Sequence, residues 1–205
     1  MTVLYSGTRI AVVEKEAGEN CEYSDSEKSL PRALEKKLGK KIYPVHRLDE
    51  RTSGLVVFAL DSEAAADLSL QIRNGVFKKE YSAVIEGTPE PSSGTLEDLL
   101  FFDRTKNKSF VVKKERKGVK KALLDYETVF EKDGFSTVRV FLKTGRTHQI
   151  RVQFASRKHP VVGDGKYGSK TGGPLMLRCE KIAFVSPECK KPVSFVSSSN
   201  FASFA

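Results

Sequence analysis

Short apolar runs separated by turn residues recur along most of this 205-residue chain. Residues 9–14 and 54–60 are rich in apolar and β-branched side chains, a pattern typical of buried strands. Alternation predicts strands at residues 79–87, 123–130 and 135–142, the last two joined across Asp133 and Gly134, a strong hairpin signal. Shorter strands are expected at residues 110–112, 175–177, 182–185 and 193–196.

Helical spacing of apolar residues appears in three places. Residues 31–38 predict a short helix with Ser29 as its cap and Gly39 at its end. A second helix begins at Asp61 or Ser62 and stops at Asn74, and a third covers residues 147–156. Strands in hairpin order with a few helices predict an α+β fold built on a largely antiparallel mixed sheet. We expect one domain over residues 1–205, with a frayed tail from residue 197.

Composition narrows the class of protein. Hydrophobic residues make up 39% and charged residues 30% of the chain, a globular balance. No apolar run approaches a membrane span, and the N-terminus lacks the pattern of a secretory signal. Three cysteines, an odd number, favour a reducing compartment such as the cytoplasm over a disulfide framework.

The same residues offer little to a metal or a nucleotide. Cys179 and Cys189 are not spaced as zinc ligands, and the histidines are scattered. Residues 163–168, GDGKYG, lack the spacing of a phosphate-binding loop and predict a tight turn. We therefore expect no metal site and no cofactor.

Positive charge is concentrated in two segments. The chain carries a net charge of +9, and residues 104–121 hold nine Lys or Arg against one acid, Glu115. Residues 138–158 hold six more and no acid. Solvated basic faces are the plain interpretation of such segments, but two in one small domain favour a polyanionic partner. A membrane surface would require a basic amphipathic helix, which the pattern does not contain.

Residues 46–55, HRLDERTSGL, precede an apolar strand and resemble the HRLDxxTSGL motif of the RluA family of RNA pseudouridine synthases. Three later segments agree with that family in order and kind. They are KEYSA at residues 79–83, TGRTHQIR at 144–151 and PVVGDGKYG at 160–168. The protein-kinase catalytic loop also begins with HRD-like letters, but its other motifs do not fit this chain.

Two positions depart from the family pattern. Glu16 stands where the family usually has proline in a K-P-x-G turn, and Arg178-Cys179 replace the His-Ala of its late strand. Both lie outside the motif that carries the acid, so they concern substrate contacts more than chemistry. We expect no N-terminal S4-type RNA-binding module, which many relatives carry, because only 45 residues precede His46.

The resemblance implies an enzyme that isomerises uridines in structured rRNA or tRNA without a cofactor, as a monomer away from membranes. It implies Asp49 as the catalytic carboxylate, acting either as a nucleophile or as a base that removes a sugar proton. It also implies Arg151 as the partner of that carboxylate and Tyr81 as the aromatic ring that stacks on the target base.

The remaining implied residues bind RNA. Arg47 would fill the space around the flipped nucleotide, while His46, Thr52, Arg146 and His148 would support the motifs or contact RNA. In the basic segment, the expected phosphate contacts are Lys113, Lys114, Arg116 and Lys117. Two alternatives are a catalytically silent RNA-binding module and a phosphoryl-transfer enzyme. An intact Asp49, Tyr81 and Arg151 argues against the first, and the missing phosphate loop argues against the second.

Overall fold

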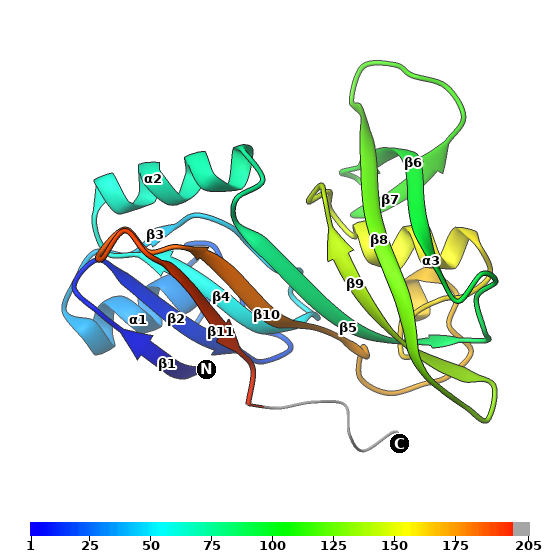
Figure 1. Ribbon diagram of the computed structural model, residues 1–205, viewed down its shortest axis with the longest axis horizontal. Helices are drawn as coiled ribbons and strands as arrows, with labels where there is room; N and C mark the ends of the chain where they lie inside the picture. Colours follow the sequence, from blue (N-terminus) through cyan, green and yellow to red (C-terminus); the bar gives the residue numbers. More distant parts are fainter. Residues whose placement is uncertain (199–205) are drawn as a thin grey trace. The chain divides into compact units, whose positions relative to one another are not determined.

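Two strands whose side chains are almost all buried lie at the centre of the first part of the fold. The computed structural model describes residues 1–198, which divide into two compact units, residues 1–79 with 178–198 and residues 80–177 (Figure 1). In the first unit, every residue of β2 (Ile10–Lys15) is buried, as are six of the seven residues of β4 (Ser53–Ala59). This burial explains why both segments read as unbroken apolar runs.

The sheet of the first unit has the order β1-β2-β4-β10, with β3 pairing with β4 and β11 with β10. All of these pairs are antiparallel except β4 and β10, which run parallel where Ser53 meets Arg178 and Gly54 meets Cys179. The helix α2 packs beside β4. The other elements are β1 (Thr2–Ser6), α1 (Leu30–Leu38), β3 (Tyr43–Pro44), α2 (Ser62–Arg73), β10 (Leu177–Val185) and β11 (Pro192–Val196).

The second unit is an antiparallel sheet of order β5-β9-β8-β6-β7. The helix α3 (Gln149–Ser156) packs against β6 and β7, and Val152 from this helix meets Leu100 and Ala122 in a small apolar core. The strands are β5 (Lys78–Glu86), β6 (Ser93–Asp103), β7 (Lys108–Val112), β8 (Val119–Lys132) and β9 (Phe135–Leu142), followed by the short 3-10 helix η1 (Gly165–Tyr167). The fold is α+β with a mixed sheet, as predicted.

The turn between β8 and β9 and the N-caps of α1 and α2 lie where the sequence predicted them. Asp133 and Gly134 both have positive φ, 52° and 80°, which suits the two-residue hairpin turn between β8 and β9. Asp61 caps α2 by accepting a hydrogen bond from the Ala64 amide at 2.7 Å. Ser29 stands at the N-cap position of α1, as predicted, but its hydroxyl donates to the Glu22 carbonyl at 3.0 Å and makes no cap hydrogen bond to the helix.

Other differences concern strands and the chain end. Of the strand expected at 175–177, only Leu177 belongs to a strand, β10, which also contains the strand expected at 182–185. No strand was predicted for β1 or β6. Residues 199–205 of the expected frayed tail lie outside the described residues, whereas Ser198 donates to Glu14 Oε2 at 2.9 Å. The single-domain expectation stays a prediction. Within residues 1–198, no helix is long and apolar enough to cross a membrane.

Candidate active site

Asp49 lies in a short loop that is fixed on both sides. Before it, the buried Leu48 donates its amide to Cys21 Sγ at 3.4 Å. After it, the amide of the buried Thr52 donates to the Asp49 carbonyl at 3.0 Å, which closes a tight turn. The backbone that carries this carboxylate is therefore held by packing and hydrogen bonds, while the Asp49 residue itself is partly exposed.

Lys15, at the end of β2, also holds this loop, through hydrogen bonds from its side chain to backbone carbonyls. Its side chain is fully buried, and its Nζ donates to the carbonyls of Glu16, Glu50 and Thr52 at 3.0, 2.8 and 2.7 Å. Burial lowers the pKa of this ammonium group. The three carbonyls together use all three ammonium donors, so the cation replaces the water that would otherwise solvate these groups.

The turn that follows Lys15 explains the first departure from the family pattern. The Glu16 amide donates to Glu19 Oε2 at 2.7 Å, a bond that proline could not make. The Gly18 amide donates to the Glu50 carbonyl at 2.7 Å. The turn thus reaches the Asp49 loop through Lys15 and Gly18, and Glu16 supports it locally.

The second departure lies on β10, next to the strand that leaves the Asp49 loop. Arg178 forms an ion pair with Glu14, and both side chains are mostly buried. The Ser197 hydroxyl accepts from Arg178 and donates to Glu14, and the Ser198 hydroxyl also donates to Glu14. Gly54 has φ of +108°, and a Cβ there would lie 2.2 Å from the Cys179 carbonyl oxygen. The glycine of the motif therefore permits close packing of β4 on β10.

His46 and Arg47, the first residues of the motif, have different surroundings. The His46 Nε2 accepts from the Val57 amide at 3.0 Å, and its ring lies 5.2 Å from that of Phe77. Burial holds the pKa of His46 well below its ordinary value, so the neutral ring serves as an acceptor. Arg47 is exposed and pairs with Glu22.

Tyr81 and Arg151 both belong to the second unit. Tyr81 is buried on β5, opposite Val140 of β9. Arg151, in the first turn of α3, is buried against Asp164: Nε lies 2.6 Å from Oδ2 and Nη2 lies 2.8 Å from Oδ1. The grouping of Asp49 with these two residues stays a prediction.

Arg146 and His148 shape the start of α3. The Arg146 Nε donates to the Lys121 carbonyl at 2.8 Å. His148 has φ of +55° at the cap of the helix, and its Nδ1 lies 3.0 Å from the Tyr167 hydroxyl. Burial raises the pKa of Tyr167 to about 12, so this hydroxyl stays protonated at neutral pH. RNA contact by Arg146 or His148 remains a prediction.

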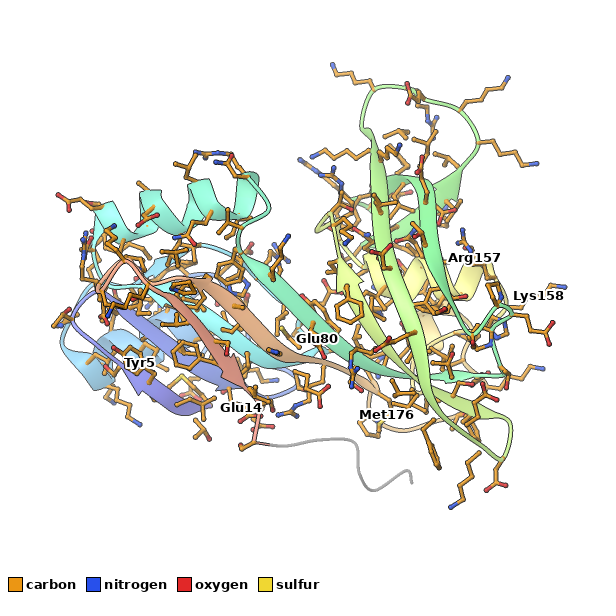
Figure 2. All side chains as sticks on the ribbon, in the orientation of Figure 1. Tyr5, Glu14, Glu80, Arg157, Lys158 and Met176 are labelled. Atoms are coloured by element: carbon orange, nitrogen blue, oxygen red, sulfur yellow. The ribbon has the colours of Figure 1, made fainter. Side chains whose placement is uncertain are left out.

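The two basic segments differ in how their charges are balanced. Four of the six cations in residues 138–158 pair with acids from neighbouring elements: Arg139, Lys143, Arg151 and Arg157. In residues 104–121, only Lys121 forms an ion pair with a described residue, Glu97. Side chains with nitrogen tips extend outward from the connection between β7 and β8, where Lys113, Lys114, Arg116 and Lys117 lie (Figure 2). This connection presents positive charge that neighbouring acids do not balance.

Two buried charged residues of the site were not expected from the sequence. Lys15 was visible only as the residue before the departure at Glu16, and Asp164 only as part of a glycine-rich turn. Both are fully buried, and both hold a motif residue. Among residues 1–198, no group of three or more His, Cys, Asp or Glu side chains is arranged to hold a metal ion.

Comparison with known proteins gives one consistent family. Residues 9–156 match the family model described as RNA pseudouridylate synthase. The chain is 36% identical over 160 residues to an uncharacterized RNA pseudouridine synthase of Mycobacterium bovis, covering 75% of this chain and 51% of that protein. It therefore spans about half the length of that relative.

Two further similarities cover nearly the whole chain. The dual-specificity RNA pseudouridine synthase RluA of Escherichia coli O157:H7 is 33% identical over 217 residues, which cover 98% of this chain and 94% of that protein. Among solved structures, human RNA pseudouridylate synthase domain containing 4 superposes with a TM-score of 0.81 at 20% identity. That match covers 97% of this chain and 88% of the human chain, and it shows a shared fold.

Proposed function

This chain belongs to the RNA pseudouridylate synthase family, and we propose that it isomerises specific uridines of structured rRNA or tRNA to pseudouridine. In this reaction the N1–C1′ bond of uridine breaks, the uracil turns, and a C5–C1′ bond forms as the C5 proton leaves. N1 regains a proton, so no atom is gained or lost overall. The proposed reaction therefore uses neither a metal nor an electron carrier, and we propose the cytoplasm as its compartment.

Asp49 is the proposed catalytic carboxylate. The observation that carries the proposal is the anchoring of its loop by buried Leu48, buried Thr52 and the Lys15 ammonium. A reacting group gains from a backbone that is fixed before substrate arrives. Attack on the sugar or base and removal of a sugar proton both use the same carboxylate oxygens, so the two routes make the same demand on this loop.

The other proposed roles follow the motifs. Arg151 orients the catalytic carboxylate, Tyr81 stacks on the target uracil, and Arg47 fills the space around the flipped nucleotide. His46, Thr52, Arg146 and His148 are proposed RNA contacts or supports of those contacts.

Substrate affinity is assigned to the segment of residues 104–121. Its cations lack acidic partners among the described residues, apart from Lys121, and phosphates would supply the missing counter-charge. Contacts to phosphate give affinity without sequence readout, so the choice of uridine rests on RNA structure near the site.

The decisive experiment measures release of tritium from RNA tritiated at C5 of uridine, in monovalent salt with excess EDTA. We expect turnover by the natural protein and a decrease of several orders of magnitude in Asp49→Asn, because an amide can neither attack nor accept the proton. The matched control is Glu50→Gln, which removes one negative charge from the exposed neighbouring side chain and should retain turnover.

Three results would count against the proposal. Substantial turnover by folded Asp49→Asn removes Asp49 from the chemistry, and turnover that requires an added metal removes the cofactor-free mechanism. A natural protein that binds structured RNA but releases no tritium is a silent binding module. Pseudouridine mapping in RNA from cells with and without the protein then identifies the modified position.

A further inference from the structure

Arg151 is held along one edge by a carboxylate buried within the second unit. Asp164 is 0% exposed and the Arg151 side chain 3%, and the two share a bidentate contact through Nε and Nη2. Two parallel charge-assisted hydrogen bonds fix the plane of a guanidinium group as well as its position. The ion pair with Asp164 therefore fixes the orientation of the Arg151 guanidinium, and both side chains are shielded from solvent.

Tyr167 holds the same guanidinium by its face. The Arg151 Cζ lies 5.1 Å from the centre of the Tyr167 ring. Asp164 caps η1 and Tyr167 ends it, and the Tyr167 amide donates to the Asp164 carbonyl at 3.0 Å. Since residues three apart in a 3-10 helix stand one above the other, one turn of chain presents both the carboxylate and the ring to Arg151.

The turn that presents these two side chains is itself rigidly held. The Ser169 amide donates to the Asp164 carbonyl at 3.1 Å, and the Ser169 hydroxyl donates to Glu86 Oε1 at 2.7 Å. Gly163 has φ of +78°, and a Cβ there would lie 2.0 Å from the Pro174 carbonyl oxygen. The Tyr167 hydroxyl also accepts from the Ser109 amide at 2.8 Å, which ties the turn to β7.

We propose that Asp164 and Tyr167 are positioning residues that fix the orientation of the Arg151 guanidinium for the isomerisation. Asp164 acts on the edge of the group and Tyr167 on its face. Neither residue is assigned to the reacting atoms. The inference rests on the proposed function, in which Arg151 orients the catalytic carboxylate. Asp164 and Tyr167 thus have a role beyond the formation of the GDGKYG turn, because a tight turn does not by itself require a carboxylate or an aromatic ring at these positions.

The first test is a double-mutant cycle in turnover. Asp164→Asn should lower kcat about 100-fold with little change in the KM for RNA, because a catalytic group is misplaced while phosphate contacts remain. In an Arg151→Met background, Asp164→Asn should cause no further decrease, because its effect passes through Arg151. Full kcat in Asp164→Asn, or effects that multiply in the double variant, would overturn the proposal.

A matched control separates positioning from general damage to the helix. Asp98→Asn weakens another carboxylate–guanidinium pair, at the C-terminal end of α3, in which Arg157 Nη1 lies 2.8 Å from Asp98 Oδ2 of β6. It should leave kcat unchanged. If Asp164→Asn does not fold, Tyr167→Leu tests the same proposal, and Tyr167→Phe should retain more kcat than Tyr167→Leu because it keeps the ring face.

A second readout does not depend on turnover. In an NMR spectrum of nitrogen-15-labelled protein, the Arg151 Nε–Hε signal, assigned by its disappearance in Arg151→Lys, should exchange slowly with solvent. Tyr167→Leu should shift this signal, and Asp164→Asn should accelerate its exchange. A signal that neither variant alters refutes the positioning role. An inactive natural protein with the expected signal changes refutes the proposed function instead.

Discussion

The Lys15 ammonium group supplies the hydrogen bonds that hold the backbone beside Asp49. Lys15 satisfies three carbonyls at once from a site with no solvent access. The cost of burying a charge is offset only when all its donors are used, as they are here. At the residue scale, Lys15 therefore supports the loop that carries Asp49 through three carbonyls.

Replacing this lysine should affect both stability and turnover. Lys15→Met keeps the length and apolar stem of the side chain but leaves the three carbonyls without their donor. We expect a decrease of about 2 kcal/mol or more in the free energy of unfolding, measured by urea denaturation, with a lower kcat for tritium release. Lys28→Met removes the same charge from an exposed position and is the control. Equal stability of the two variants would contradict this account.

At the scale of elements, sequence pattern predicted the helices and central strands well. Asp61 and Ser29 show what the pattern could not predict. Both occupy N-cap positions, but only the Asp61 side chain makes a cap hydrogen bond. Both residue types favour a helix N-terminus, but the Ser29 hydroxyl binds the Glu22 carbonyl, a partner seven residues earlier that a local pattern cannot reveal. In the same way, the motif singled out Asp49 as the candidate catalytic residue. It could not reveal that Lys15 binds the Thr52 carbonyl or that Asp164 binds Arg151, because these partners are distant in the sequence.

The Asp61 cap can be separated from its ion pair by two substitutions. Asp61 accepts from the Ala64 amide and pairs with Arg9 at 2.8 Å. Asp61→Ala should lower the free energy of unfolding at pH 7 by about 1 kcal/mol. Asp61→Asn should be less destabilised, because an amide oxygen still caps the helix. Ser62→Ala, at an exposed neighbouring position, is the control.

The pH dependence of these variants has a definite sign. The hydrogen bond from Arg9 holds the pKa of Asp61 below its ordinary value, so the folded state binds this proton less readily than the unfolded state. The stabilisation is complete above about pH 4 and is lost as the pH falls below that value. The difference between the natural protein and Asp61→Asn should shrink over this range. A difference that grows on acidification would contradict the assignment.

At the scale of the whole molecule, the sequence gives the number of charged residues in a segment. It does not show which of the cations form ion pairs with acids in the fold. Residues 138–158 and 104–121 look alike as sequence, yet acids on adjacent strands and loops neutralise most of the first segment and little of the second. Those acids are far from their partners along the chain. Only the fold therefore distinguishes the segment whose positive charge the described acids leave unbalanced.

Removing this unbalanced charge should change how RNA affinity depends on salt. We expect lower affinity when Lys113, Lys114, Arg116 and Lys117 are replaced by Ser. The slope of log K against log salt should become shallower by about 0.7–0.9 for each phosphate that the variant no longer binds. Replacing Lys28, Lys36, Lys37 and Lys40, which are exposed in the first unit, lowers the net charge equally and is the control. Equal slopes for the two quadruple variants would mean that net charge, and not this segment, determines binding.

The close approach of Gly54 to Cys179 has a consequence for how such motifs are used to identify enzymes. No side chain fits at Gly54, because the carbonyl of the adjacent strand occupies the space. A relative that had lost catalysis, but still had to fold, would keep this glycine, because its role is in packing and not in the reaction. The glycine of the motif therefore marks the architecture, and under the proposed function the retained Asp49 carboxylate marks an active enzyme.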